Sequence, residues 1–184
     1  MKLAKTRAGF GAAGVICAIS SIIVLMFSTY GDELSLSPTA AEIIGNAEGC
    51  RRDPYHCPAG VLTVGIGSTE YSGEKIDPKH RYSDLEIAER WKNDLVAAEQ
   101  CVNRFANGAQ LPQSVFDAAV SITFNVGCGA MSKSTMFNYL RQNRYTQACY
   151  ELPKWVYAGG KKLPGLVARR EKEKALCLTD LKPR

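Results

Sequence analysis

The chain of 184 residues is long enough for one compact domain and a short appendage. Hydrophobic residues make up 46% of it and charged residues 22%, which excludes a chain that is disordered throughout. The formal net charge is +5, and the lysines and arginines are spread along the sequence rather than grouped in blocks. This basic balance suits an anionic polymer, but no basic stripe with interleaved aromatic residues is present, and we therefore expect no nucleic-acid partner.

The N-terminal segment has the order of an export signal. Three basic side chains precede an uncharged run from residue 8 to residue 30, which is long enough to span a bilayer. Glycine, alanine and serine dilute the isoleucines of this run, so its insertion should be marginal and its later release feasible. We expect an uncleaved signal anchor over residues 1–30 and a folded domain over residues 31–184. A cleaved signal peptide and a permanent anchor are the alternatives.

The first predicted elements after this run place one carboxylate at a helix end. A short polar linker over residues 31–36 leads to Ser37 and Pro38, which have the N-cap and first-turn pattern of a helix. Glu48 lies on the last turn of this helix, where the negative end of the helix dipole favours an uncharged carboxyl. Turn signals and alternating β-branched residues over 51–72 then predict a small β-hairpin.

A long helix follows, with Ser83 and Glu86 as a capping box and a single apolar stripe up to about residue 105. Four more helices are expected over residues 112–126, 132–142, 146–152 and 165–178. These elements indicate an α+β protein that is mostly α. We expect a small β-hairpin lobe, a long linking helix and a helical C-terminal lobe. Two lobes joined by a helix leave a cleft, and extended polymers bind in clefts.

The cysteines indicate disulfide bonds in an oxidising compartment such as the periplasm. Their spacing contains no CxxC pair and no histidine and cysteine cluster of zinc-ligand type, so we expect no metal site and no cofactor. Their number is odd, which leaves one thiol over. The seven are Cys17, Cys50, Cys57, Cys101, Cys128, Cys149 and Cys177.

Residues 48–67 resemble the active-site region of the T-even phage-type lysozymes, glycoside hydrolase family twenty-four. The family motif is a glutamate at a helix end, eight intervening residues, an aspartate, five intervening residues and a threonine on a hairpin strand. Glu48 and Thr63 match this spacing, and Cys57 occupies the aspartate position. The resemblance implies a lysozyme-like fold over residues 31–184.

Two later segments extend the resemblance. Residues 117–127 are similar to the helix behind the substrate cleft, and residues 155–171 to the family's closing segment. Residues 48–55 and 57–60, together with Cys17 in the apolar run, most resemble the signal-arrest-release endolysins of temperate phages, in which a cysteine takes the aspartate position. The resemblance implies a muramidase that hydrolyses the β-1,4 bonds between N-acetylmuramic acid and N-acetylglucosamine in peptidoglycan and so lyses the host cell.

The residues themselves support this chemistry. Cleavage of a glycosidic bond needs a proton donor for the leaving oxygen and stabilisation of an oxocarbenium-like centre. Glu48, partly desolvated in a cleft, is the expected catalytic acid. A thiolate at Cys57 would activate or orient water or supply negative charge, and Thr63 would hold the water by hydrogen bonds. Three further residues are expected to organise the cleft: Asn125, Arg169 and Arg170.

A regulatory disulfide is also predicted. Six residues separate Cys50 from Cys57, so a small loop can bring them within disulfide distance and silence Cys57. After release from the bilayer, the Cys17 thiolate could attack Cys50 and displace Cys57. The endolysin subgroup is known for this type of isomerisation; the alternative is a static Cys50–Cys57 bond. Proximity and the resemblance suggest the permanent pairs Cys149–Cys177 and Cys101–Cys128.

Partners and location follow from the same resemblance. Peptidoglycan glycan strands are the expected substrate, and inner-membrane lipid, through residues 8–30, and the host export machinery are the expected partners before release. We expect a monomer that is first tethered, inactive, on the periplasmic face of the host inner membrane and then acts in the periplasm. Three other functions remain open. They are a membrane-tethered thiol redox protein, an inactive wall-binding module and a lytic transglycosylase.

Overall fold

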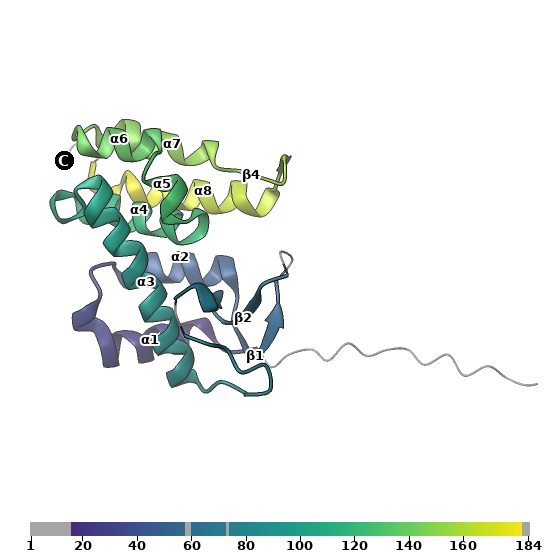
Figure 1. Ribbon diagram of the computed structural model, residues 1–184. Coiled ribbons are helices and arrows are strands. Elements are labelled where there is room, and N and C mark those ends of the chain that lie inside the picture. The colour runs from purple at the N-terminus through teal and green to yellow at the C-terminus, as the bar shows by residue number, and fades with distance from the viewer. Residues whose placement is uncertain (1–15, 58–59, 73, 182–184) are drawn as a thin grey trace, which may run out of the picture.

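Two lobes and a long helix that joins them make up the protein, as a computed structural model shows (Figure 1). The structure describes residues 16–57, 60–72 and 74–181. The linking helix is α3 (Asp84–Ala106). The chain is mostly helical with small antiparallel sheets, which confirms the predicted fold class. The smaller lobe contains α1 (Ile19–Tyr30), α2 (Pro38–Glu48), β1 (Arg51–His56), β2 (Leu62–Gly65) and β3 (Ser68–Thr69).

The larger lobe is helical and lies beyond the C-terminal end of α3 (Figure 1). Its fully buried core includes Met131, Phe137 and Leu140. The helix predicted over residues 132–142 is shorter than expected and follows a separate single turn, α5. The elements of this lobe are α4 (Gln113–Val126), α5 (Cys128–Met131), α6 (Thr135–Arg141), α7 (Tyr145–Glu151), β4 (Tyr157–Ala158), β5 (Lys161–Lys162) and α8 (Pro164–Cys177).

Side-chain caps determine where the two helices that frame the site begin. Ser37 Oγ accepts a hydrogen bond from the backbone N–H of Ala40 at the start of α2. At the start of α3, the Ser83 N–H donates to Glu86 Oε2 at 2.7 Å, and the Glu86 N–H donates to Ser83 Oγ at 3.3 Å. The capping box predicted from the sequence is therefore present.

The predicted β-hairpin is part of a three-stranded antiparallel sheet in the order β1-β2-β3. Tyr55 pairs with Thr63 and His56 with Leu62 across β1 and β2. A second hairpin, β4–β5, was not predicted, because strands of two residues are too short to show alternation. Its signal was the Gly159-Gly160 pair at the turn, since both residues have positive φ angles, 55° and 74°.

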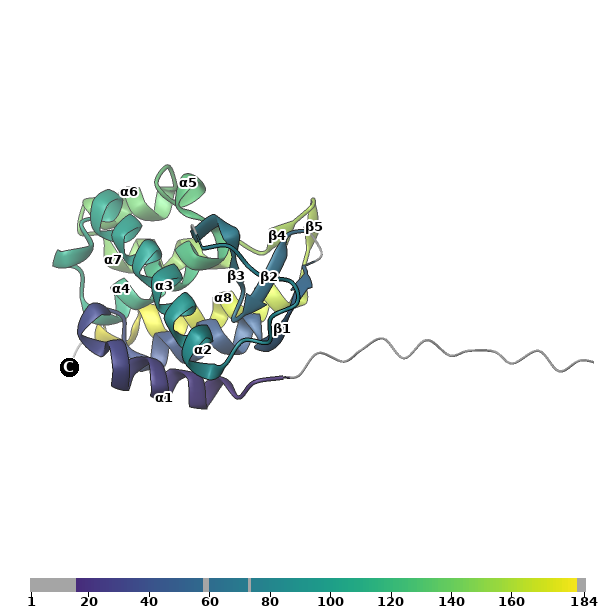
Figure 2. The same ribbon diagram turned by 60° about the horizontal axis from the view of Figure 1, so that its bottom comes forward.

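Helix α1 packs against α2 and α3 rather than standing apart (Figure 2). Ile22 and Met26 on its inner face are 0% exposed. Residues 1–15, which include the basic residues and the first part of the predicted membrane segment, lie outside the described residues. Within residues 16–57, 60–72 and 74–181, none of the helices combines the length and apolar character that crossing a bilayer requires.

The segment between α1 and α2 is the short linker that the sequence predicts over residues 31–36, but it is not polar and exposed throughout. It begins with a 3-10 turn, and Leu36 is buried at 2% exposure. The backbone N–H groups of Ser35 and Leu36 donate to Glu99 Oε1 at 2.9 and 2.7 Å. Burial of one apolar side chain and a carboxylate on α3 therefore hold this connection in place.

Two disulfides connect elements of the helical lobe. Cys101 on α3 is bonded to Cys128 on α5, with 5.8 Å between their Cα atoms. Cys149 on α7 is bonded to Cys177 on α8, with a Cα separation of 5.7 Å. These are the pairs that the sequence analysis suggested, and they fasten α3 and α8 to the same lobe.

Candidate active site

Glu48 lies at the junction of the two lobes. It is the last residue of α2, and its side chain is 24% exposed. On the side of the small lobe it faces Gly67, where an added Cβ would lie 3.5 Å from Glu48 Oε2. On the side of the large lobe, Arg169 Nη1 donates to Glu48 Oε1 at 2.6 Å. The carboxyl group is therefore placed by both lobes and still reaches solvent.

Two separate hollows lie between the lobes beside this carboxyl, and together they are called the groove below. The first has a volume of about 490 Å³ and is lined by Glu48, Asn125, Arg169 and the start of α8. The second has a volume of about 300 Å³ and is lined from both lobes, by Gly67 and Asp94 on one side and by Phe124 and Gly127 on the other. A groove on both sides of a carboxyl suits an extended polymer that passes across it.

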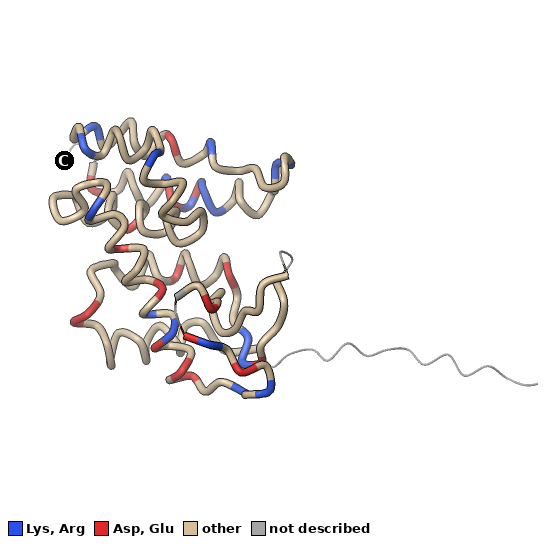
Figure 3. The backbone as a smooth tube through the Cα atoms, viewed as in Figure 1, with Lys and Arg blue, Asp and Glu red and all other residues tan. Residues whose placement is uncertain are grey.

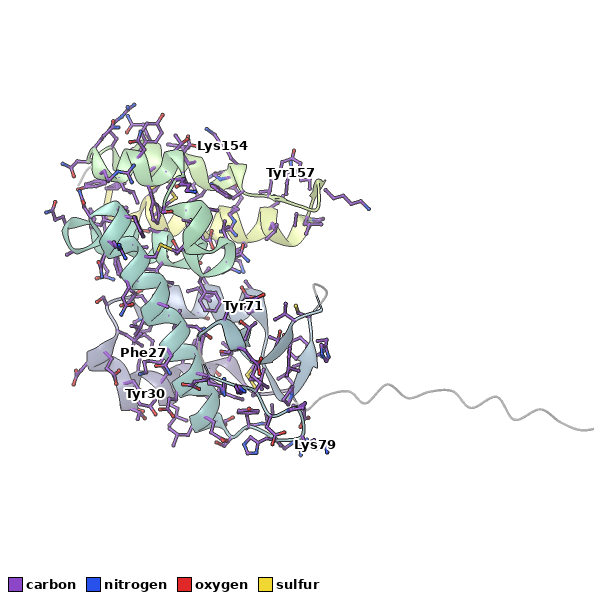
Figure 4. The ribbon with its side chains drawn as sticks, viewed as in Figure 1. Phe27, Tyr30, Tyr71, Lys79, Lys154 and Tyr157 are labelled. Carbon is purple, nitrogen blue, oxygen red and sulfur yellow. A yellow bond between two sulfur atoms is a disulfide. The ribbon has the colours of Figure 1, made fainter. Side chains whose placement is uncertain are left out.

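The walls of this groove carry groups that suit a sugar chain. Tyr71, at the second hollow, is 87% exposed, and Figure 4 shows it between the lobes. Exposed aromatic rings offer flat apolar faces on which sugar rings can stack. Basic residues lie along α8 and the β4–β5 hairpin (Figure 3), and Lys172 of α8 lines the first hollow.

The hairpin brings Cys57 and Thr63 to one face. Tyr55 pairs with Thr63, and the Cys57 N–H donates to the Val61 carbonyl at 3.0 Å, which continues the same register. Alternate residues of a strand share a face, so Tyr55, Cys57 and Thr63 do so here. Burial raises the pKa of the Tyr55 phenol, Arg51 opposes this shift, and the charges of Glu48 and Cys57 add to it. Glu48 and Cys57 therefore both act electrostatically on the same phenol.

Thr63 is almost fully enclosed. Its side chain is 3% exposed, and its Oγ1 donates a hydrogen bond to the Val61 carbonyl at 3.0 Å. Since the hydroxyl proton is used in this bond, only the oxygen lone pairs remain to hold a water molecule. Cys57 is half-buried and, of the seven cysteines, it is the one that carries a thiol in this structure.

The third disulfide joins Cys17, just before α1, to Cys50, just before β1, with a Cα separation of 5.2 Å. The backbone adds two contacts at the same place. The Cys17 N–H donates to the Cys50 carbonyl at 3.4 Å, and Ile16 forms an isolated bridge with Arg51. This disulfide therefore fastens the start of α1 two residues away from Glu48.

The arginines expected to organise the cleft do so in different ways. Arg169 contacts Glu48 directly, whereas Arg170 Nη2 donates to Asn125 Oδ1 and Nε to the Trp155 carbonyl. Sequence reasoning missed Glu173, a fully buried carboxylate that binds both arginines. Its only signal was the i,i+3 and i,i+4 spacing on one helix, which is equally typical of an exposed ion pair. In the part of the chain that the structure describes, no three histidine, cysteine or acidic side chains form a metal-binding group.

A carboxyl between two lobes, within a groove open to a polymer and beside a small β-sheet, defines a glycosidase of the lysozyme type. Comparison with known proteins gives the family. The phage lysozyme family model matches residues 45–173. The SAR-endolysin of Escherichia phage P1 is 38% identical over 188 residues, which cover 96% of this chain and 97% of that protein.

Two solved structures of that phage's endolysin are similar to this one. The active form of P1 phage endolysin Lyz has a TM-score of 0.84 at 37% identity and covers 94% of this chain and 99% of its own. The secreted inactive form has a TM-score of 0.57 at 37% identity. The match covers 80% of this chain and 98% of that one. The chain therefore belongs to the phage lysozyme family, and it is a muramidase.

Proposed function

We propose that this muramidase is an endolysin that hydrolyses the β-1,4 bonds between N-acetylmuramic acid and N-acetylglucosamine in peptidoglycan, with Glu48 as the catalytic acid. The observation that carries this assignment is the position of Glu48 between two hollows at the junction of the lobes. A glycan strand that follows the groove passes directly over this carboxyl. Glu48 then protonates the leaving oxygen as the glycosidic bond breaks.

Cys57 and Thr63 are proposed to act on the other side of the reacting sugar. They share one face of the hairpin, and the charge of Cys57 acts on the same Tyr55 phenol as that of Glu48. The Cys57 thiolate would activate or orient the attacking water or stabilise the positive centre. The lone pairs of Thr63 Oγ1 would hold that water, since its proton is donated to Val61.

We further propose that residues 1–30 first tether an inactive form to the host inner membrane, after passage through the host export machinery, and that release activates it as a periplasmic monomer. In the tethered form Cys50 is bonded to Cys57. After release, the Cys17 thiolate attacks the Cys50 sulfur, a Cys17–Cys50 bond forms, and Cys57 leaves as a thiolate. Exchange of one disulfide for another needs no oxidant or reductant.

Three findings support this activation. Cys17 is bonded to Cys50 while Cys57 carries a thiol, and α1 packs into the small lobe with Ile22 fully buried. The structure is also more similar to the active form of P1 phage endolysin Lyz than to its secreted inactive form, with TM-scores of 0.84 and 0.57. Replacement of Cys17 by serine should abolish lysis. Normal lysis by Cys17→Ser would show that the Cys50–Cys57 bond, if it forms, is static.

The assignment of Glu48 is tested with Glu48→Gln and a matched control, Glu42→Gln, on the exposed side of the same helix. On purified sacculi, Glu48→Gln should lose clearing of turbidity, whereas Glu42→Gln should keep the parent's activity. A thiol redox protein or an inactive wall-binding module would show no difference between the two. Products with reducing ends indicate hydrolysis, and products with anhydro ends indicate a lytic transglycosylase instead.

A further inference from the structure

Glu173 is a buried carboxylate that the reaction described above does not use. It lies on α8 at 0% exposure. Its Oε1 accepts hydrogen bonds from Arg169 Nε at 3.0 Å and from Ser121 Oγ at 2.6 Å, and its Oε2 accepts one from Arg170 Nη1. Both oxygens are held by donors, so Glu173 is a fixed negative charge inside the helical lobe.

Arg169 connects this charge to Glu48. A guanidinium group is planar and rigid, so hydrogen bonds at two of its nitrogens restrict the direction in which the third points. Nε is held by Glu173, and Nη2 donates to the Ser121 carbonyl at 3.2 Å. Nη1 is thereby directed at Glu48 Oε1, which lies 2.6 Å away. The position of the Glu48 carboxyl is thus determined from the opposite lobe, through Arg169.

The charge balance among Glu48, Arg169 and Arg170 also depends on Glu173. Arg169 is 5% exposed and Arg170 is 0% exposed, and buried charges are costly unless neighbouring charges neutralise them. Burial lowers the pKa of Arg170, and Glu173 opposes this shift. Two guanidiniums face two carboxylates, so the charges balance when Glu48 is ionised. When Glu48 carries the proton that it must donate, the four groups have one excess positive charge. Without Glu173 they would have two excess positive charges.

Given the proposed role of Glu48 as the acid, on which this inference rests, we propose that Glu173 is a positioning residue for the hydrolysis. By holding Arg169 and neutralising one of the two buried guanidiniums, it determines where the Glu48 carboxyl lies and how readily that carboxyl takes up its proton. Glu173 itself contacts neither the substrate nor the reacting atoms.

Other charged or titratable groups also face Glu48. Tyr55 on β1 interacts with it electrostatically and is itself also affected by Cys57, and Arg170 acts on it from α8. Lys172 lines the same hollow. Tyr55, Cys57 and Lys172 are unchanged in every variant below, so differences between the variants report on Glu173 and Arg170 alone.

The test is the pH dependence of kcat/KM on purified sacculi, with the full chain in its Cys17–Cys50 form. The alkaline limb of this profile reports the loss of the proton from the catalytic acid. Glu173→Gln should move that limb to lower pH by about one unit, the effect expected of one unit charge through a partly screened interior. Glu171→Gln makes the same charge change on an exposed part of α8, where Glu171 pairs with Lys174, and should leave the limb in place.

Two further variants separate an electrostatic role from a structural one. Arg170→Gln removes the opposite charge and should move the limb to higher pH. The double variant Arg170→Gln/Glu173→Gln restores the balance and should return the limb to within about 0.3 units of the parent's, a small fraction of the single-charge effect. If Glu173→Gln does not fold, the comparison of Arg170→Gln with the double variant still measures the contribution of Glu173.

A limb that stays in place in all these variants, or moves in the same direction in both single variants, would overturn the proposal. Glu48→Gln keeps this result distinct from a failure of the proposed function. If Glu48→Gln is inactive while the limb is insensitive to Glu173, only the positioning role is wrong. If Glu48→Gln retains activity, the catalytic assignment itself fails.

Discussion

Replacement of Gly45 by alanine should selectively weaken the packing of α1 on the small lobe. Gly45 is a buried residue in the middle of α2, and a Cβ added there would lie 2.6 Å from Ile19 Cγ2 and 3.3 Å from Trp91 Cη2. The first distance is too short for two carbon atoms, so the Ile19 side chain or the start of α1 must shift. Overpacking of this kind costs about 1–3 kcal/mol, and the better helix propensity of alanine returns up to about 1 kcal/mol.

The net cost is therefore about 1 kcal/mol, which corresponds to an equilibrium ratio of about fivefold. The assay equilibrates the full chain in a thiol buffer and measures the ratio of Cys17–Cys50 to Cys50–Cys57 by peptide mapping. Gly45→Ala should lower this ratio about fivefold, because only the first bond requires α1 to pack here. Gly31→Ala is the matched control, since an added Cβ there meets nothing within 4 Å. Equal ratios in the two variants would refute the coupling between α1 packing and disulfide choice.

Three further predictions concern stability and substrate binding. Hydrogen bonds from the Ser83 side chain and backbone lower the pKa of Glu86 to about 2. The ionised Glu86 carboxylate therefore stabilises the fold above the pKa that Glu86 has in the unfolded chain, and this contribution is lost as the pH falls through about 2. In urea titrations the free energies of unfolding of the parent and of Glu86→Gln should therefore differ at pH 6 and converge near pH 2. The difference at pH 6 should be less than about 1 kcal/mol, because the Glu86 side chain is 44% exposed. A difference that is the same at both pH values would contradict this prediction. Removal of the Cys101–Cys128 bond, which spans 27 residues, should lower the free energy of unfolding by about 3–4 kcal/mol in denaturant titrations, and a loss below about 1 kcal/mol would argue against its stabilising role. Tyr71→Ala should raise KM on sacculi by roughly 2–10-fold at an unchanged kcat, if its exposed ring stacks on a sugar, whereas an unchanged KM would exclude that contact.

The helix boundaries near the site were predictable because their signals are local. Ser37 at the start of α2 and the Ser83–Glu86 capping box of α3 act through hydrogen bonds within one turn, and Pro38 acts through its fixed φ angle. The β4–β5 hairpin was missed because its strands have two residues each. Its stability depends on contacts that short-range patterns do not encode.

The packing of α1 could be predicted only in outline. The uncharged run over residues 8–30 indicates a membrane segment, and the same apolar side chains can also fill a protein core. Which face of the helix is buried depends on tertiary neighbours such as Trp91 and the small residue Gly45. The burial of Leu36 in the linker over residues 31–36 was missed for a related reason, since its partner Glu99 lies 63 residues away in sequence.

Part of the candidate site could likewise be predicted from the sequence, and part could not. Glu48, Cys57 and Thr63 were identified by their spacing, and the structure gathers them around one helix end and one hairpin, although their catalytic roles remain predictions. Glu173 could not be recognised, because Arg169, Arg170 and Glu173 have the spacing of an ordinary surface ion pair. Only the fold reveals that this group is fully buried and reaches Glu48 through Arg169.

The most direct test of the account is the rate at which reducing N-acetylmuramic acid ends appear in purified sacculi treated with the full chain in its Cys17–Cys50 form. The parent and Glu42→Gln should release them at the same rate. Glu48→Gln, with its fold verified by circular dichroism and disulfide mapping, should be slower by about 10²–10⁴-fold, the usual contribution of general acid catalysis. A folded Glu48→Gln whose rate lies within threefold of the parent's would contradict the assignment of Glu48 as the proton donor.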